Sequence, residues 1–247
     1  MTPALLDNSD LPLVLIGGTL CNARLWQPIV ERLNVASVTC VTLTGADTAQ
    51  RASRRLLNAL PPRFLLAGFS LGAIVALQIA ADAPERLCGL GLISANPLAD
   101  PPEKAAPRRE AVRTARTQGV ADWLLAALWR DYVAPSRLHD AGLRNVIGQM
   151  ANECGIDTFA AQTEIAIHRR DNRAALGTLA CPILILNGAQ DGICTPHHHQ
   201  LLAESAANAA WHTVETGGHF IPLETPDEVA APLRQWITEC IQCVKTD

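Results

Sequence analysis

The stretch Gly68-Phe69-Ser70-Leu71-Gly72 decides the fold, because its G-x-S-x-G spacing predicts a sharp turn from a strand into a helix. Residues 64–67 before it form a short apolar run after two prolines, which is typical of a buried parallel strand. Residues 71–81 after it are almost wholly apolar, which predicts a buried helix. Such a turn holds the Ser70 hydroxyl at the helix N-terminus, where only glycine-sized neighbours fit.

A serine hydroxyl is a weak nucleophile unless a histidine accepts its proton and a third group orients that histidine. The motif alone also fits a Gly-Ser loop that caps a core helix, so it needs partners elsewhere in the chain. Candidate partners follow in the sequence. Asp191 closes the stretch Asn187-Gly188-Ala189-Gln190-Asp191, and His219 follows the pair Gly217-Gly218.

Composition sets the class of protein. The chain has 247 residues, of which 49% are hydrophobic, so it can bury a core with or without an inserted lobe. No stretch approaches a membrane span, and residues 1–11 lack a signal-peptide pattern, so we expect a cytoplasmic protein without a membrane partner. The net charge of -4 gives no electrostatic case for nucleic acid.

Two clusters have residue types that bind metals. Cys240 and Cys243 have the C-x-x-C spacing, but no second pair accompanies them and they fall on a helical pattern. His197, His198 and His199 are consecutive, and consecutive helical side chains point about 100° apart, so they do not converge on one ion. We expect the other cysteines to be small core residues. The sequence therefore predicts neither a metal site nor a cofactor.

Strand-like and helix-like segments alternate along the first 96 residues. The predicted strands are residues 11–16, 38–43, 64–67 and 87–94, and the predicted helices are residues 24–33, 50–60 and 71–81. This alternation indicates an α/β protein with a parallel sheet covered by helices on both faces, whose functional loops lie at the strand carboxyl ends. Too few residues precede the first strand for an opening hairpin, so we expect that strand to be interior.

The alternation stops after Asn96-Pro97 and offers no strand candidate from residue 100 to about residue 177. We interpret residues 97–178 as a helical cap inserted into a core made of residues 1–96 and 179–247. Residues 120–132 carry a strong apolar face at helical spacing. That face either packs within the protein or brings Trp129 or a neighbour to an acyl pocket.

The alternation then resumes. Strands are predicted at residues 182–186 and 211–214, and helices at residues 199–207 and 229–244. The total is six strands, which we expect to be all parallel. Asp191 and His219 each lie just beyond a predicted strand, as Ser70 does, so all three fall at one edge of the sheet. The alternatives are His139, His168 and His212 for the histidine, and Glu215 and Glu224 for the acid.

These motifs resemble those of the α/β-hydrolase family, from residue 11 nearly to the chain end. The resemblance rests on four stretches: Gly17-Gly18-Thr19, Gly68-Phe69-Ser70-Leu71-Gly72, Gly188-Ala189-Gln190-Asp191 and Gly218-His219-Phe220-Ile221-Pro222. The segment from residue 17 to residue 26, together with the insertion, is most similar to the small capped carboxylesterases that include the pimeloyl-carrier-protein methyl ester esterase.

The resemblance implies roles for individual residues. Ser70 would be the nucleophile, His219 the general base and then acid, and Asp191 the group that fixes the imidazole tautomer. The backbone N–H groups of Leu71 and Thr19 would form the oxyanion hole. Family members commonly have His-Gly where this chain has Gly17-Gly18, so Leu20 remains an alternative to Thr19.

The predicted function is hydrolysis of a small-molecule carboxylic ester or thioester through an acyl-serine intermediate. A lyase that uses the same three residues and a ligand receptor on the same fold remain the alternatives. Arg109, Arg113 and Arg116 share one helical face with Arg108 nearby, and such a stripe could dock an acidic carrier protein or a phosphate-bearing thioester. A solvated helix face is the simpler interpretation of these arginines.

Overall fold

The computed structural model describes residues 5–8 and 10–246, and within them it forms one six-stranded sheet. The strands are β1 (Leu13–Ile16), β2 (Val38–Val41), β3 (Phe64–Phe69), β4 (Leu87–Ile93), β5 (Ile183–Gly188) and β6 (Ala209–Val214). All neighbouring strands pair in parallel, in the order β2-β1-β3-β4-β5-β6. The predicted six parallel strands and the interior position of the first strand are confirmed.

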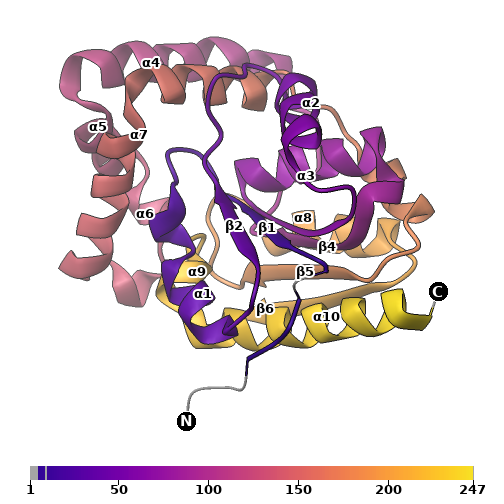
Figure 1. The fold of residues 1–247 in the computed structure, drawn as a ribbon. Coiled ribbons are helices and arrows are strands. Elements are labelled where there is room, and N and C mark those ends of the chain that lie inside the picture. The colour runs from indigo at the N-terminus through magenta and orange to yellow at the C-terminus, as the bar shows by residue number, and fades with distance from the viewer. Residues whose placement is uncertain (1–4, 9, 247) are drawn as a thin grey trace.

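Helices cover both faces of this sheet (Figure 1). Helices α1 (Gln27–Leu33) and α10 (Pro226–Thr246) lie on one face, and α2 (Ala49–Ala59), α3 (Leu71–Asp82) and α8 (Pro196–Ser205) lie on the other. Alternate residues of β1 enter two separate apolar clusters: Leu13 and Leu15 join α1 and α10, whereas Val14 and Ile16 join α3 and α8. Because both faces are buried, the central strands are continuously apolar, which made them visible in the sequence.

The segment between β4 and β5 contains no strand in the described chain, in agreement with the sequence pattern. It consists mainly of α4 (Ala105–Gln118), α5 (Val120–Ala127), α6 (Trp129–Tyr132) and α7 (Ala141–Ile167). These helices pack on one another and gather at one end of the sheet (Figure 1). We refer to residues 97–178 as the insertion; its boundaries and its role as a cap stay predictions.

Some element boundaries differ from the sequence patterns. The expected helix over residues 120–132 is two helices, α5 and α6, because Leu128 has φ -121° and ψ -9°. Helix α8 begins at Pro196, three residues before the predicted start at His199. Thr195 explains this early start, since its hydroxyl and the His198 ring form a reciprocal capping box with each other's backbone N–H groups.

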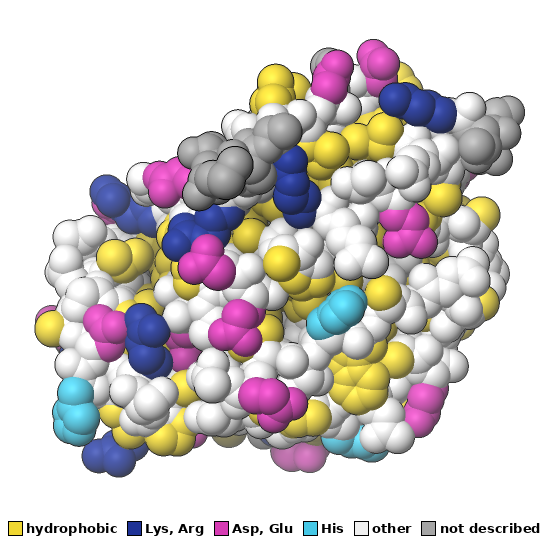
Figure 2. All heavy atoms as spheres, turned by 90° about the horizontal axis from the view of Figure 1, so that it is seen from below, with side chains coloured by type: hydrophobic (Ala, Val, Ile, Leu, Met, Phe, Trp, Pro, Cys, Tyr) yellow, Lys and Arg dark blue, Asp and Glu magenta, His cyan; other side chains and the backbone are white. Residues whose placement is uncertain are grey.

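Figure 2 shows the face that lies at the bottom of Figure 1, where Lys and Arg side chains are interspersed with Asp and Glu side chains. No single charge sign dominates the described residues of this face. Over the described part of the chain, none of the helices combines the length and the apolar character needed to span a membrane.

Candidate active site

Ser70 lies at the sharp turn between β3 and α3, with φ 52° and ψ -113°. This conformation is strained for a residue with a side chain. The two motif glycines allow it, because a Cβ on Gly68 would lie 2.4 Å from the carbonyl oxygen of Gly72, and a Cβ on Gly72 would lie 2.3 Å from that of Ile16. The turn therefore packs directly on its own helix and on β1.

His219 lies between β6 and α9 (Ile221–Glu224), and its backbone is held on two sides. Its N–H donates to the carbonyl oxygen of Tyr132 at 3.0 Å, and its carbonyl oxygen accepts a hydrogen bond from Ser94 Oγ at 2.8 Å. Glu224 Oε2 accepts hydrogen bonds from the N–H groups of Gly218 and Ala134 at 3.2 and 2.7 Å. These contacts tie the histidine loop both to β4 and to the insertion.

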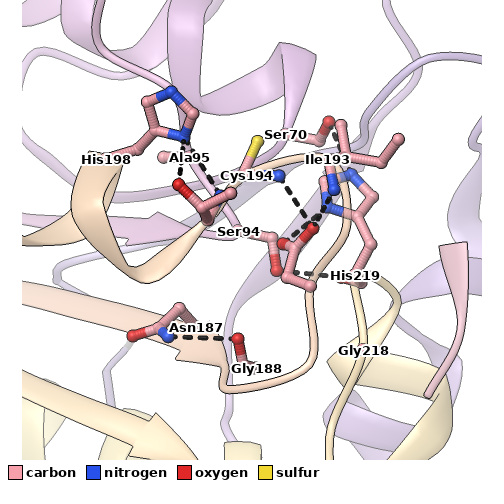
Figure 3. Close-up of polar contacts among 12 residues, drawn as sticks. Ser70, Ser94, Ala95, Asn187, Gly188, Ile193, Cys194, His198, Gly218 and His219 are labelled. Carbon is pink, nitrogen blue, oxygen red and sulfur yellow. Dashed lines mark hydrogen bonds and ion pairs between the residues drawn. The ribbon is translucent and has the colours of Figure 1, made fainter. Parts of the chain in front are cut away.

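The structure brings Ser70, His219 and Asp191 into one hydrogen-bonded chain (Figure 3). His219 Nε2 lies 2.9 Å from Ser70 Oγ, and His219 Nδ1 lies 2.8 Å from Asp191 Oδ2. The other carboxylate oxygen, Oδ1, accepts hydrogen bonds from the N–H groups of Ile193 and Cys194, both at 2.7 Å. These two amides fix the carboxylate, which in turn orients the ring of His219.

Burial protects this arrangement from water. Asp191 is 4% exposed and His219 is 2% exposed. The rings of Phe69 and Phe220 lie 5.0 and 5.8 Å from the His219 ring, and the Tyr132 ring stacks on it at 5.7 Å. The electrostatic attraction between Asp191 and the ring of His219 is stronger here than in water, because the surrounding side chains exclude solvent.

The two predicted oxyanion donors, Thr19 and Leu71, line the cavity that contains Ser70. Leu71 is the first residue of α3, where an N–H has no partner within the helix. In the described part of the chain, the Thr19 N–H also has no acceptor, whereas the Leu20 N–H donates to Gln162 Oε1 at 2.8 Å. The geometry therefore favours Thr19 over Leu20.

A cavity of about 600 Å³ opens onto Ser70 and His219. Its walls come largely from the insertion, including the apolar side chains of Trp123, Leu124, Leu128 and Phe159. Trp129 does not line it. The Trp129 indole N–H donates to the carbonyl oxygen of Leu138 and the Arg144 guanidinium lies over its ring, so Trp129 packs within the insertion while its neighbours line the cavity.

The alternative acids and histidines are either exposed or bonded to other groups. His168 pairs with Glu164 on the exposed side of α7, and His212 is exposed on β6. Glu224 is buried close to His219 but bonds to backbone amides, and burial raises the pKa of its carboxyl group. The sequence pattern missed the roles of Glu224 and Gln162, although a glutamine beside the apolar residues Phe159-Ala160-Ala161 was a usable signal.

Among the described residues, one group has metal-ligand types within reach of one another: Asp191, Cys194 and His219. A metal would need the Cys194 thiolate, but burial raises the pKa of this thiol well above its ordinary value. The facing atoms of Asp191 and His219 already bond to each other. This group is therefore suited to proton transfer rather than to metal binding.

The consecutive histidines do not converge. His197 is exposed and His198 caps α8. His199 is buried, and its Nε2 accepts a hydrogen bond from the Ala95 N–H at 2.8 Å. Of the two cysteines with C-x-x-C spacing, Cys240 is buried in the core and Cys243 is exposed.

The arginines on the face of α4 are all ion-paired within the insertion. Arg109 pairs with Glu164, Arg113 with Glu110, and Arg116 with Asp157. Such surface pairs reduce the net charge of the face. The face therefore presents both signs of charge rather than a basic stripe.

Comparisons with known proteins agree with this geometry. The bifunctional biotin biosynthesis protein BioHC of Cellvibrio japonicus is 26% identical over 240 residues, which cover 91% of this chain and 47% of that protein. The chain thus spans about half the length of this relative. The pimeloyl-acyl-carrier-protein methyl ester esterase of Aromatoleum aromaticum is 29% identical over 200 residues, which cover 76% of this chain and 80% of that protein.

Two further matches extend over nearly the whole chain. The 2-succinyl-6-hydroxy-2,4-cyclohexadiene-1-carboxylate synthase of Salmonella arizonae is 27% identical over 250 residues, covering 92% of this chain and 94% of that protein. The solved structure of a thermophilic esterase from Thermogutta terrifontis has a TM-score of 0.83 at 23% identity and covers 93% of this chain and 90% of that one. The model of the alpha/beta hydrolase family matches residues 13–231, and the chain therefore belongs to this family.

Proposed function

We propose that this protein is a serine hydrolase that cleaves a carboxylic ester or thioester through an acyl-Ser70 intermediate. The observation that carries the proposal is the chain of two hydrogen bonds, 2.9 Å from Ser70 Oγ to His219 Nε2 and 2.8 Å from His219 Nδ1 to Asp191 Oδ2. This arrangement is the one that converts a weak hydroxyl nucleophile into a reactive one.

The proton follows these two bonds. His219 Nδ1–H donates to Asp191, so Nε2 carries the lone pair that accepts the Ser70 proton as Oγ attacks the acyl carbon. The imidazolium then donates this proton to the leaving oxygen or sulfur. In the second half of the reaction, His219 accepts a proton from water as the water oxygen attacks the acyl carbon, and the imidazolium then returns this proton to Ser70 Oγ as the acid leaves.

The N–H groups of Thr19 and Leu71 are proposed to stabilise the tetrahedral intermediate. Negative charge moves to the former carbonyl oxygen in that intermediate, and fixed donors stabilise it without reorganisation. One such donor contributes on the order of 3 kcal/mol to lowering the barrier. The insertion is proposed to act as a cap, since it supplies most of the apolar wall that would hold the acyl chain.

A non-hydrolytic reaction at the same three residues is the second candidate. The relative named as a synthase resembles the chain over nearly its whole length, whereas the match to the pimeloyl-acyl-carrier-protein methyl ester esterase covers a smaller share of both chains. In such a reaction His219 would remove a proton from the substrate, and no acyl enzyme would form.

The test is hydrolysis of p-nitrophenyl esters of graded acyl length by the wild type and by Ser70→Ala. Ester hydrolysis predicts turnover by the wild type, an acyl-enzyme burst, and loss of both in the variant. Labelling of Ser70 by a fluorophosphonate without turnover of any ester would favour the second candidate. Absence of both turnover and labelling would contradict the assignment of Ser70, His219 and Asp191 altogether.

A further inference from the structure

One end of the cavity is strongly basic. Its lining includes Arg108 on α4, Lys104 just before α4, and Arg169 just after α7. Asp100 lies against the two arginines and its side chain is 1% exposed. The wall near Ser70 and the apolar residues of the insertion belong to the same cavity.

Asp100 holds the two guanidinium groups side by side. Arg108 donates from Nε and Nη2 to the two oxygens of Asp100 at 2.8 and 2.9 Å, and Arg169 donates from Nη1 to one of them at 2.8 Å. Burial by itself would raise the pKa of Asp100, but the hydrogen bonds and charges of the two arginines outweigh it, so the net pKa shift is downward. Asp100 is therefore ionised.

The charges in this cluster do not balance. Two guanidinium groups share one carboxylate, which leaves one positive charge. The Arg169 side chain is withdrawn from water at 7% exposed, whereas that of Arg108 is 35% exposed. Lys104 adds a further positive charge at the exposed rim. An unbalanced buried charge is costly, and a bound anion would offset that cost.

Donors remain for such an anion. Arg169 Nε donates to the carbonyl oxygen of Leu98 and Nη1 to Asp100, and in the described residues its Nη2 has no acceptor. Arg108 Nη1 and Asn96 Nδ2 likewise have no acceptor there, and both residues line the cavity. Two guanidinium edges and one amide thus provide N–H groups without protein partners, which is the chemistry that binds a carboxylate.

We propose that Arg108, Arg169 and Asn96, at this basic end of the cavity, bind a free carboxylate of the substrate, so that the preferred ester also carries an acid group. The inference rests on the proposed ester hydrolysis and names its substrate class. A monoanion matches the single unbalanced charge of Asp100, Arg108 and Arg169, while Lys104 is exposed at the rim. Asp100 is a positioning residue that sets the spacing of the two arginines.

Turnover supplies the first test. Each substrate pair consists of the monoethyl ester of a dicarboxylic acid and the ethyl ester of the monocarboxylic acid of equal length, over a series of lengths. We expect kcat/KM to favour the charged ester at one length by at least about tenfold, as charge-assisted hydrogen bonds of this kind allow. Arg108→Gln should abolish that preference, because it should lower kcat/KM for the charged ester at least about tenfold more than for the neutral ester of equal length. The control is Arg109→Gln, whose side chain pairs with Glu164 outside the cavity.

Binding supplies a second test that does not need turnover. Calorimetry with Ser70→Ala should show binding of the charged ester that weakens at least about tenfold on addition of Arg108→Gln. Equal binding of charged and neutral esters at every length would overturn the proposal. Tighter binding of a phosphate-bearing ester than of the carboxylate would overturn the carboxylate assignment. A third outcome separates the two proposals. If Ser70→Ala binds the charged ester more tightly than the neutral one but the wild type hydrolyses neither, the carboxylate site is supported and the proposed ester hydrolysis is contradicted.

Discussion

The side-chain oxygen of Gln162 accepts a hydrogen bond from the N–H of Leu20 at 2.8 Å, across 142 residues of sequence. The Gln162 amide nitrogen donates to the carbonyl oxygen of Leu43 at 2.9 Å. Leu20 has φ 55°, a left-handed conformation that this bond helps to hold. A residue of the insertion therefore fixes the loop that contains Thr19, and it occupies the N–H that would otherwise compete with that of Thr19.

Gln162→Met should slow the chemical step because it frees this loop. Loss of one oxyanion donor costs on the order of 3 kcal/mol, so a partial displacement is expected to lower kcat by about 10- to 100-fold with little change in KM. Steady-state kinetics on the best p-nitrophenyl ester measures both constants. Gln149→Met, at an exposed position on the same helix, is the control. A variant that loses stability but keeps kcat within about twofold would show that Gln162 has only a structural role.

Asp191→Asn should reduce kcat by on the order of 10⁴, the effect of the equivalent change in a well-studied Ser-His-Asp protease. The asparagine oxygen can still accept from the Ile193 and Cys194 amides, but its NH₂ group then faces His219 Nδ1. That contact favours the tautomer with the proton on Nε2, which cannot accept the Ser70 proton. Asp122→Asn, exposed on α5, is the matched control. A loss below about tenfold would argue that another group orients the histidine.

Gly72→Ala should destabilise the fold, because its Cβ would lie 2.3 Å from the carbonyl oxygen of Ile16 and 2.7 Å from that of Gly17. Both are backbone atoms at the end of β1, so relief requires movement of the sheet. We expect the free energy of unfolding in urea to fall by about 2–3 kcal/mol. Gly177→Ala, where the nearest atom would be 3.6 Å away, should change it by less than about 0.5 kcal/mol. Equal effects of the two substitutions would contradict this packing argument.

His199 should make stability depend on pH. Burial lowers its pKa from 6.5 to about 4, because the folded protein holds the ring neutral between Ala95 and Thr195. Between these values the unfolded chain binds a proton that the folded chain does not. This contribution to stability is therefore complete above pH 6.5 and is lost as the pH falls toward 4, by about 3 kcal/mol in all.

The comparison of wild type with His199→Leu isolates that contribution. The stability difference between the two proteins, measured by urea unfolding, should be largest above pH 6.5 and should shrink by about 3 kcal/mol on approach to pH 4. His197→Leu, at the exposed neighbouring position, should keep the pH profile of the wild type. A difference that stays constant with pH would mean that folding does not change the proton affinity of His199, which would contradict this account.

The fold could be predicted because its signals are local. Each central strand is a short apolar run buried on both faces, as in β3 and β5. Ser70, Asp191 and His219 each come soon after a strand, and parallel strands end at one edge. Their contact with one another could therefore be anticipated as a hypothesis from order and spacing alone.

Contacts between the core and the insertion could not be predicted. The bond between Gln162 and Leu20 and the bond between Ala134 and Glu224 depend on how the insertion packs against the core, which no local pattern records. The break between α5 and α6 falls at Leu128, without the glycine or proline that marks other breaks. The preference for Thr19 over Leu20 needed the position of the Gln162 side chain.

The cavity described above draws its reactive groups and its walls from different parts of the chain. Ser70 and His219 lie on loops of the core, whereas Trp123, Phe159 and Arg169 come from the segment between β4 and β5. Substitutions at Trp123, Phe159 or Arg169 can change the shape and charge of the cavity without removing a group of the Ser70–His219–Asp191 hydrogen bonds. After a gene duplication, one copy could therefore diverge toward a new metabolite while inheriting its reaction chemistry intact.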